Sequence, residues 1–235
     1  MSKKELLILQ ASNDIACAES MTIAHQAELF GINAVSNMKT VSTPKELARV
    51  LFSGKVYDYI YLCAHATDEG FGTKDGGFFV SWGELAMLIC ESGCTKEDAV
   101  FMLACCRSGY DQVAFNLFYT CRKIQYVFGP RSTVDGPTLV AGTHSFFYNM
   151  VHRHEQPDKA AKRASKSTGY DFLCYDMMEA KTSQEYYSYV AGAEEDENWQ
   201  SPEWHAAYEV KFHLRDIPNG PYANEEDILA EASRV

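Results

Sequence analysis

Two residues with side chains suited to nucleophilic chemistry, His65 and Cys106, each stand at the end of a strongly apolar segment. The segments are YDYIYLCA (57–64) and AVFMLA (99–104), and their content of aromatic and branched residues is typical of buried strands. In a parallel α/β sheet the carboxyl ends of neighbouring strands share one edge, where such folds bind ligands. The sequence therefore predicts that His65 and Cys106 meet at this edge, although 41 residues separate them.

The chemistry that a cysteine and a histidine perform together is attack on a carbonyl carbon. A thiolate is the nucleophile, the imidazole takes or returns the proton, and backbone N–H groups, here those of Ala66 and Cys106, stabilise the oxyanion. A helix expected from Tyr110 follows Cys106, and its N-terminal dipole favours a thiolate. Alternation along a strand points Cys105 and Cys106 to opposite sides, so only one of them can face His65. We assign Cys106 as the nucleophile, and Cys105 stays the alternative.

The segments around these residues resemble a known family. YLCAHA (61–66), ACCRSG (104–109) and IQYVFGPRSTVDGPTLVAGTHSFFYNMV (124–151) are similar to the clan of cysteine peptidases that contains caspases, metacaspases, separases and bacterial CHAT domains, and most similar to CHAT domains. Ala66 stands where this family commonly has glycine, and Cys105 where it commonly has alanine. The resemblance implies a caspase-like α/β fold, a three-layer sandwich with a mostly parallel central sheet flanked by helices.

The resemblance also implies an activity. It points to a cysteine endopeptidase that cleaves a protein or peptide substrate through a dyad of His65 and Cys106. Bacterial members of the family commonly act in regulated proteolysis, including defence systems. We therefore expect a regulatory protein partner or signal that switches the peptidase on.

Four further residues are candidates for substrate contact. Asp135 falls near the position of an acidic residue that in relatives lines the pocket for the side chain before the cut, and it can equally cap the following turn. Arg131 could contact an acidic substrate residue. Asp68 and Glu69 could orient the imidazole of His65 or contact substrate, or they are solvated loop acids.

Two other interpretations of the chain stay open. One is a catalytically inactive relative that serves as a regulatory or partner-binding module, and the other is a flavodoxin-like protein that binds a ligand or performs thiol redox chemistry. Phosphate-binding glycine motifs and a C-x-x-C motif are absent from the sequence, so no cofactor is expected. Cys90 and Cys94 are spaced C-x3-C without a second pair of ligands, so no metal site is expected either.

Alternation of short apolar runs with helical periodicity predicts the elements of a largely parallel sheet. The expected strands are 5–10, 33–38, 57–64, 99–104, 124–129 and 208–214, and the expected helices are 15–30, 44–52, 82–91, 110–121, 142–153, 157–167 and a short one from residue 224. The glycine-rich stretch 68–85 is expected to form a hairpin or an active-site loop.

Composition sets the wider frame. The 235 residues carry 21 Lys and Arg against 32 Asp and Glu, a formal net charge of −11 that argues against nucleic acid as a partner. No apolar run is long enough to span a bilayer, and no export signal precedes the first strand, so we expect a cytoplasmic protein that does not bind membranes. Eleven acids and three bases lie after residue 189. We expect a peptidase domain over 1–189 and an acidic segment over 190–235. The acidic segment should consist of a strand and a short helix and pack on the same domain. Its run 194–197 is expected to be a solvated loop or a surface that guides a basic partner.

Overall fold

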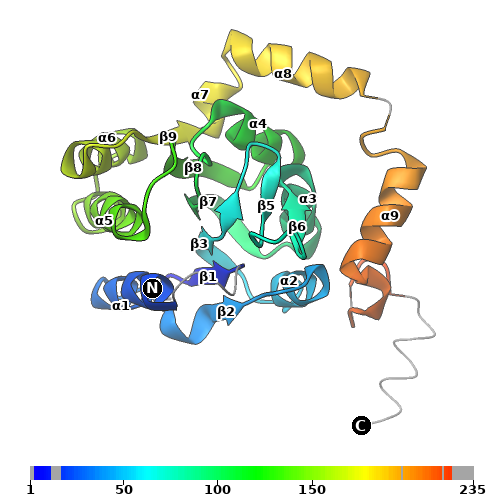
Figure 1. The fold of residues 1–235 in the computed structure, drawn as a ribbon, viewed down its shortest axis with the longest axis horizontal. Coiled ribbons are helices and arrows are strands. Elements are labelled where there is room, and N and C mark those ends of the chain that lie inside the picture. Colours follow the sequence, from blue (N-terminus) through cyan, green and yellow to red (C-terminus); the bar gives the residue numbers. More distant parts are fainter. Residues whose placement is uncertain (1–2, 12–16, 197, 219, 224–235) are drawn as a thin grey trace.

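The computed structural model describes residues 3–11, 17–196, 198–218 and 220–223, which form three layers with a six-stranded sheet in the middle (Figure 1). The strand order is β2-β1-β3-β7-β8-β9, and every neighbouring pair is parallel except β8 with β9. The strands are β1 (Leu6–Gln10), β2 (Met38–Thr40), β3 (Tyr57–Cys63), β7 (Thr95–Ala104), β8 (Ile124–Pro130) and β9 (Phe172–Asp176). The predicted mixed α/β fold with a mostly parallel central sheet is confirmed.

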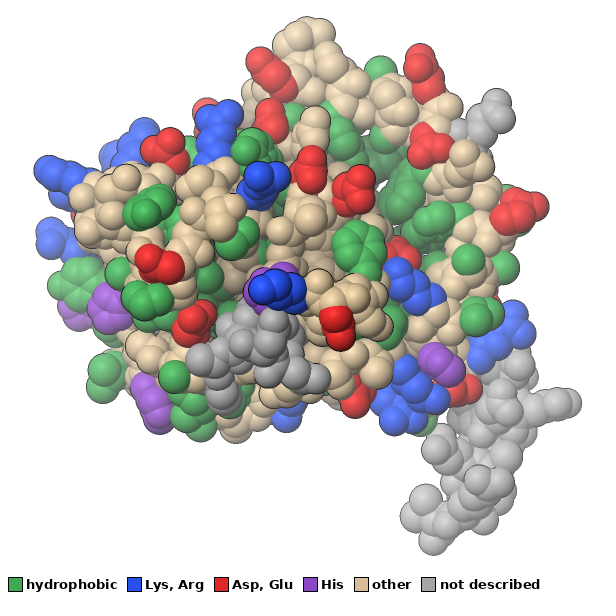
Figure 2. All heavy atoms as spheres, in the orientation of Figure 1, with side chains coloured by type: hydrophobic (Ala, Val, Ile, Leu, Met, Phe, Trp, Pro, Cys, Tyr) green, Lys and Arg blue, Asp and Glu red, His purple; other side chains and the backbone are tan. Residues whose placement is uncertain are grey.

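Helices cover both faces of this sheet because the central strands are apolar on both sides. Successive side chains of a strand point to opposite faces, so Tyr61 and Met102 pack on one face while Ile60 and Phe101 pack on the other. The first face is covered by α1 (Cys17–Leu29), α5 (Gly136–Phe147) and α6 (Pro157–Thr168), and the second by α2 (Pro44–Leu51), α3 (Trp82–Ser92) and α4 (Asp111–Thr120). Figure 2 shows cationic side chains over α6. None of the helices described is long and apolar enough to cross a bilayer.

A small antiparallel sheet follows β3 directly. It consists of β4 (His65–Ala66), β5 (Gly70–Gly72) and β6 (Phe79–Ser81). Gly70 and Gly72 have no room for a side chain, because a Cβ atom would overlap the carbonyl groups of Val80 and Phe78. The hairpin expected within 68–85 is therefore confirmed, and glycine is required for its close pairing.

The chain after β9 wraps around the second face of the molecule (Figure 1). Its elements are α7 (Met177–Ala180), α8 (Gln184–Glu195), α9 (Pro202–Phe212) and the 3₁₀ turn η3 (Leu214–Asp216). Tyr208, Phe212 and Leu214 are buried in the same hydrophobic core as α2 and α3. Residue 190 lies inside α8, and the division of the chain at that position stays a prediction. The short helix expected from residue 224 lies outside the described residues.

The strand expected over 208–214 is wrong, because this stretch belongs to α9 and η3. Ser201 caps α9 by accepting a hydrogen bond from the N–H of Trp204 at 3.1 Å. Tyr208 and Phe212, four residues apart, share the buried face. Val210, which completed the apparent alternation, is 75% exposed.

Two other expected boundaries are also wrong. Within the strand expected over 33–38, Val35–Asn37 form a 3₁₀ turn, η1, and β2 begins only at Met38. The side-chain amides of Asn33 and Asn37 donate to the Glu5 carboxylate at 2.9 and 2.6 Å and hold this turn. The helix expected from residue 142 begins at Gly136 instead, where Asp135 caps it, and it ends in a π-helical turn, η2 (Tyr148–His152). A polar contact decides the backbone conformation in both places, a distant one from Glu5 and a local one from Asp135.

Candidate active site

The pairing of the two central strands brings His65 and Cys106 to one edge of the sheet. Cys63 and Ala104 are the last paired residues of β3 and β7. His65 and Cys106 each lie two residues beyond that pair, and neighbouring strands run about 4.8 Å apart. The chain therefore brings both residues to the carboxyl edge of the sheet, and their direct pairing stays a prediction.

The two adjacent cysteines occupy opposite environments. Cys105 is buried, its thiol donates to the carbonyl of Leu62 at 3.4 Å, and burial raises its pKa well above the ordinary value for a thiol. Cys106 is partly exposed, and its thiol donates to the carbonyl of Val134 at 3.8 Å. Since a thiolate needs solvation or a charged partner, the geometry favours Cys106 over Cys105 as a nucleophile. The opposite orientations also disfavour a disulfide between them.

The turn that follows Cys106 is fixed by several hydrogen bonds. The buried hydroxyl of Ser108 lies 2.7 Å from the carbonyl of Cys105 and 2.9 Å from that of Leu103. The N–H of Gly109 donates to the carbonyl of Pro130 at 2.8 Å. A rigid turn of this kind holds a nucleophile and its backbone N–H in one geometry, which preorganised catalysis requires.

A tyrosine from the edge strand also holds this turn. The hydroxyl of Tyr175 donates to the carbonyl of Gly109 at 3.0 Å. Burial, and next the charge of Asp111, raises the pKa of Tyr175 to about 12, so the phenol keeps the proton that it donates. Strand β9 is thereby tied to the segment that carries Cys106.

His65 and Ala66 are held by the small sheet. His65 pairs with Gly72 and Ala66 with Phe71. Trp82, fully buried at the start of α3, donates from its indole to the carbonyl of Thr67 at 3.1 Å. The loop after His65 is thus anchored by β5 on one side and by Trp82 on the other.

The other predicted site residues lie around this edge in different roles. Asp135 is exposed and caps α5, and the hydrogen bonds from Thr138 hold its pKa below the usual range. The Asp135 carboxylate therefore acts as a helix cap, which is the second of the two roles expected for it. The carbonyl that accepts from the Cys106 thiol belongs to its neighbour Val134. Asp68 and Glu69 are exposed on the loop that follows His65.

Arg131 is exposed at the end of β8, and its guanidinium lies 5.9 Å from the ring centre of Tyr110. It lines a pocket of about 440 Å³ together with Asp111, Asp176 and Glu179. Glu185 lines the same pocket, and four carboxylates around one guanidinium make it unsuited to an acidic ligand. Among the residues that the structure describes, no group of three His, Cys, Asp or Glu side chains could hold a metal ion.

Sequence reasoning missed two residues near this edge. Glu19 lies on α1, and burial together with the charge of Asp135 raises its pKa; a Cβ atom on Gly136 would overlap its carboxylate. Trp82 holds the loop of His65. Neither residue belongs to a local motif, and only the apolar context of Trp82 after a glycine-rich hairpin could have indicated a packing role.

Comparison with known proteins relates this architecture to solved structures. No protein-family model matches the sequence, and no curated protein matches it significantly. The fold is similar to that of iotapain, a secreted C11 cysteine protease from Bacteroides thetaiotaomicron, with a TM-score of 0.55 and 10% identity over 77% of this chain and 68% of that one. The chain therefore has the caspase-like fold found in this C11 protease.

Two further structures resemble the chain at lower scores. An inactive zymogen of a C11 protease from Parabacteroides distasonis gives a TM-score of 0.49 and 9% identity over 76% of this chain and 63% of that one. Gingipain R, an Arg-specific cysteine proteinase, gives 0.47 and 10% over 78% and 43%.

Proposed function

We propose that this protein is a cysteine endopeptidase in which Cys106 is the nucleophile and His65 the acid and base. The observation that carries the proposal is the strand pairing that delivers His65 and the accessible member of the Cys105–Cys106 pair to one edge of the sheet. That edge is where α/β folds place their ligands. The caspase-like fold, found in a cysteine protease, supports the same conclusion.

The proposed reaction has two halves. His65 takes the thiol proton of Cys106, the thiolate sulfur bonds to the scissile carbonyl carbon, and the N–H groups of Ala66 and Cys106 bind the oxyanion. The carbon–nitrogen bond then breaks as His65 gives its proton to the leaving amine. Water, deprotonated by His65, hydrolyses the thioester, and the proton returns to the thiolate of Cys106.

The test is cleavage of a mixed peptide library, with new termini identified by mass spectrometry. Cys106→Ala and His65→Ala should each abolish cleavage, whereas Cys90→Ala, which removes an exposed thiol on α3, should leave it unchanged. Activity that survives in Cys106→Ala and is lost in Cys105→Ala would reverse the assignment of the nucleophile.

A second measurement separates a peptidase from an inactive relative. The alkylation rate of each cysteine with iodoacetamide reports its thiolate. Cys106 should react faster than Cys90, and Cys94, whose pKa burial raises to about 11, should react more slowly than either at neutral pH. A library left uncut, together with a Cys106 no more reactive than Cys90, would indicate a non-catalytic module.

We further propose that proteolysis is switched on inside the cell by a partner protein or signal. The resemblance of YLCAHA and ACCRSG to CHAT-type peptidases supports this regulation, including a role in bacterial defence. The purified protein should cut the library slowly, and an extract of the source cells should accelerate it. The Cys106→Ala protein with the same extract is the control, and an unchanged rate would contradict the proposal.

A further inference from the structure

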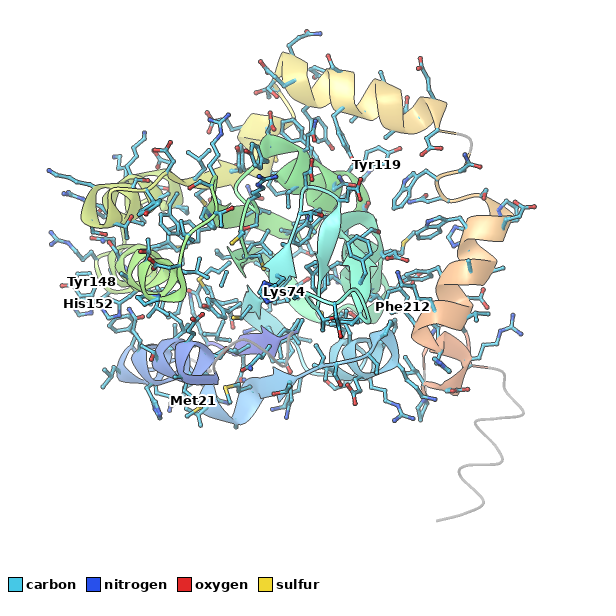
Figure 3. The ribbon with its side chains drawn as sticks, viewed as in Figure 1. Met21, Lys74, Tyr119, Tyr148, His152 and Phe212 are labelled. Atoms are coloured by element: carbon cyan, nitrogen blue, oxygen red, sulfur yellow. The ribbon has the colours of Figure 1, made fainter. Side chains whose placement is uncertain are left out.

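The chain after α8 contacts α3 through side chains near both ends of that helix. Residues 198–218, here called the C-terminal arm, carry a ladder of aromatic rings. Trp199 and Trp204 have ring centres 4.8 Å apart, Trp204 stacks on Tyr208 at 5.0 Å, and Tyr208 contacts Phe212 at 5.1 Å. Figure 3 shows Phe212 on the side of α9 that faces the body of the molecule, where it is fully buried.

Polar contacts fix the arm at both ends of α3. The ammonium of Lys211 lies 2.8 and 2.7 Å from the two carboxylate oxygens of Glu84. The hydroxyl of Tyr208 donates to Glu91 at 3.1 Å. Glu84 and Glu91 are seven residues apart, so they lie on the same face of the helix, two turns from each other. The arm is therefore tied to two points of α3.

The contact at Glu84 involves the residue that starts α3. Glu84 completes a capping box with Ser81: its carboxylate accepts the Ser81 N–H at 2.8 Å, and its own N–H donates to the Ser81 hydroxyl at 3.2 Å. Lys211 balances the charge of this capping carboxylate, whose side chain is only 12% exposed. Gly83, in the same turn, lies against the ring of Trp199, and a Cβ atom there would overlap that ring.

The first turn of α3 in turn holds the loop after His65. The backbone N–H of Trp82 donates to the carbonyl of Glu69 at 3.2 Å, and its indole N–H donates to the carbonyl of Thr67 at 3.1 Å. Ser81 pairs with Gly70 of β5 in the small sheet. One turn of helix thus contacts the arm on one side and the histidine loop on the other.

We propose that the C-terminal arm positions His65 and Ala66 through the first turn of α3, with Trp199 and Lys211 as positioning residues. This inference rests on the proposed function, because it concerns the same dyad. Displacing the arm shifts the first turn of α3, and the loop that follows His65 moves with Trp82. The arm is therefore a control point for the reactivity of Cys106.

The test uses the full-length protein and needs no substrate. The rate of Cys106 alkylation by iodoacetamide is measured across about pH 5–9 for each variant, with His65→Ala as the reference for a lost histidine. Gly83→Ala drives Trp199 off α3, and Trp199→Ala removes the contact from the other side. Each should lower the neutral-pH rate by about 3- to 30-fold and shift the pH profile toward that of His65→Ala.

A double variant and a matched control sharpen the result. The double variant Gly83→Ala/Trp199→Ala lacks the indole ring that the added methyl group would overlap. Its Cys106 should therefore be alkylated no more slowly than that of Trp199→Ala alone. Gly192→Ala makes the same chemical change in α8, where a Cβ atom meets nothing within 4 Å, and should react like the wild type. Lys211→Met keeps the apolar stem and removes the charge, and should slow Cys106 as well.

Two failures are distinguishable. If His65→Ala leaves the rate and pH profile of Cys106 unchanged, the dyad itself is wrong. If His65→Ala slows Cys106 while Trp199→Ala and Lys211→Met, folded by circular dichroism, keep the wild-type profile, the arm does not position the histidine. Should Gly83→Ala fail to fold, these two variants decide the question.

Discussion

Replacing Ser108 with alanine should destabilise the protein through the turn that carries Cys106. The Ser108 hydroxyl is fully buried and within hydrogen-bond distance of the carbonyls of Cys105 and Leu103. A hydroxyl has one proton, so Ser108→Ala removes one donated bond and leaves a buried carbonyl without it. Loss of such a bond costs about 1–2 kcal/mol of unfolding free energy, which for a chain of this length lowers the thermal midpoint by about 2–8 °C.

The matched control is Ser167→Ala on α6. The Ser167 hydroxyl also donates to the carbonyl three residues earlier, that of Ala164, at 2.9 Å, but Ser167 is exposed. Water replaces the lost partner there, so the unfolding free energy should change by less than about 0.5 kcal/mol. Thermal and urea unfolding followed by circular dichroism measure both variants. Equal losses for Ser108→Ala and Ser167→Ala would refute the reasoning from burial.

A second substitution tests the packing of the same turn. A Cβ atom on Gly129 would overlap the Ser108 hydroxyl, so Gly129→Ala should cost about 1–3 kcal/mol by overpacking. Ser108→Ala removes the Oγ atom that this Cβ atom would overlap. The double variant should therefore lose clearly less stability than the sum of the single variants, and strict additivity would show that the two residues do not share this contact.

Two further predictions concern other parts of the molecule. Gly142→Ala should cost about 1–3 kcal/mol in thermal unfolding, because a Cβ atom would overlap the ring of Phe172, whereas Gly192→Ala, in open space, should be neutral or stabilising by up to about 1 kcal/mol; a loss at Gly192 would contradict this. Glu19→Gln should raise the thermal midpoint at pH 7. Burial, and next the charge of Asp135, raises the pKa of Glu19, so the charged carboxylate destabilises the folded state above that pKa. The gain in thermal midpoint of Glu19→Gln should therefore disappear below about pH 4, where the carboxyl is protonated. A gain that persists in acid would show that the charge of Glu19 is not its cause.

The central sheet and its edge could be predicted because their signals are local. The run YDYIYLC in β3 is apolar almost throughout, as a strand covered on both faces must be, and the same holds for the end of β7. His65 and Cys106 each follow one of these runs, so the parallel topology alone brings both to one edge of the sheet. Cys105 and Cys106 face opposite environments as expected, although they lie in the turn just beyond the end of β7.

The errors arise where distant residues decide the structure. Residues 33–38 curl because Glu5, far away in the sequence, accepts hydrogen bonds from Asn33 and Asn37. The stretch 208–214 alternates in hydrophobicity but folds as a helix, since the Ser201 cap and the aromatic ladder against α3 outweigh the local pattern. The contact between Trp199 and Gly83 has no sequence signature at all.

The order of synthesis gives the C-terminal arm a temporal consequence. Its anchors join distant parts of the chain: 127 residues separate Glu84 from Lys211, and 171 separate Lys45 from Asp216, whose ion pair is 2.7 Å long. At about 5–20 residues per second on the ribosome, His65 is translated roughly 7–30 s before Lys211. A nascent chain would carry His65 and Cys106 for most of this interval without the arm. On the proposed role of the arm, Cys106 would reach its full reactivity only after translation has passed residue 211.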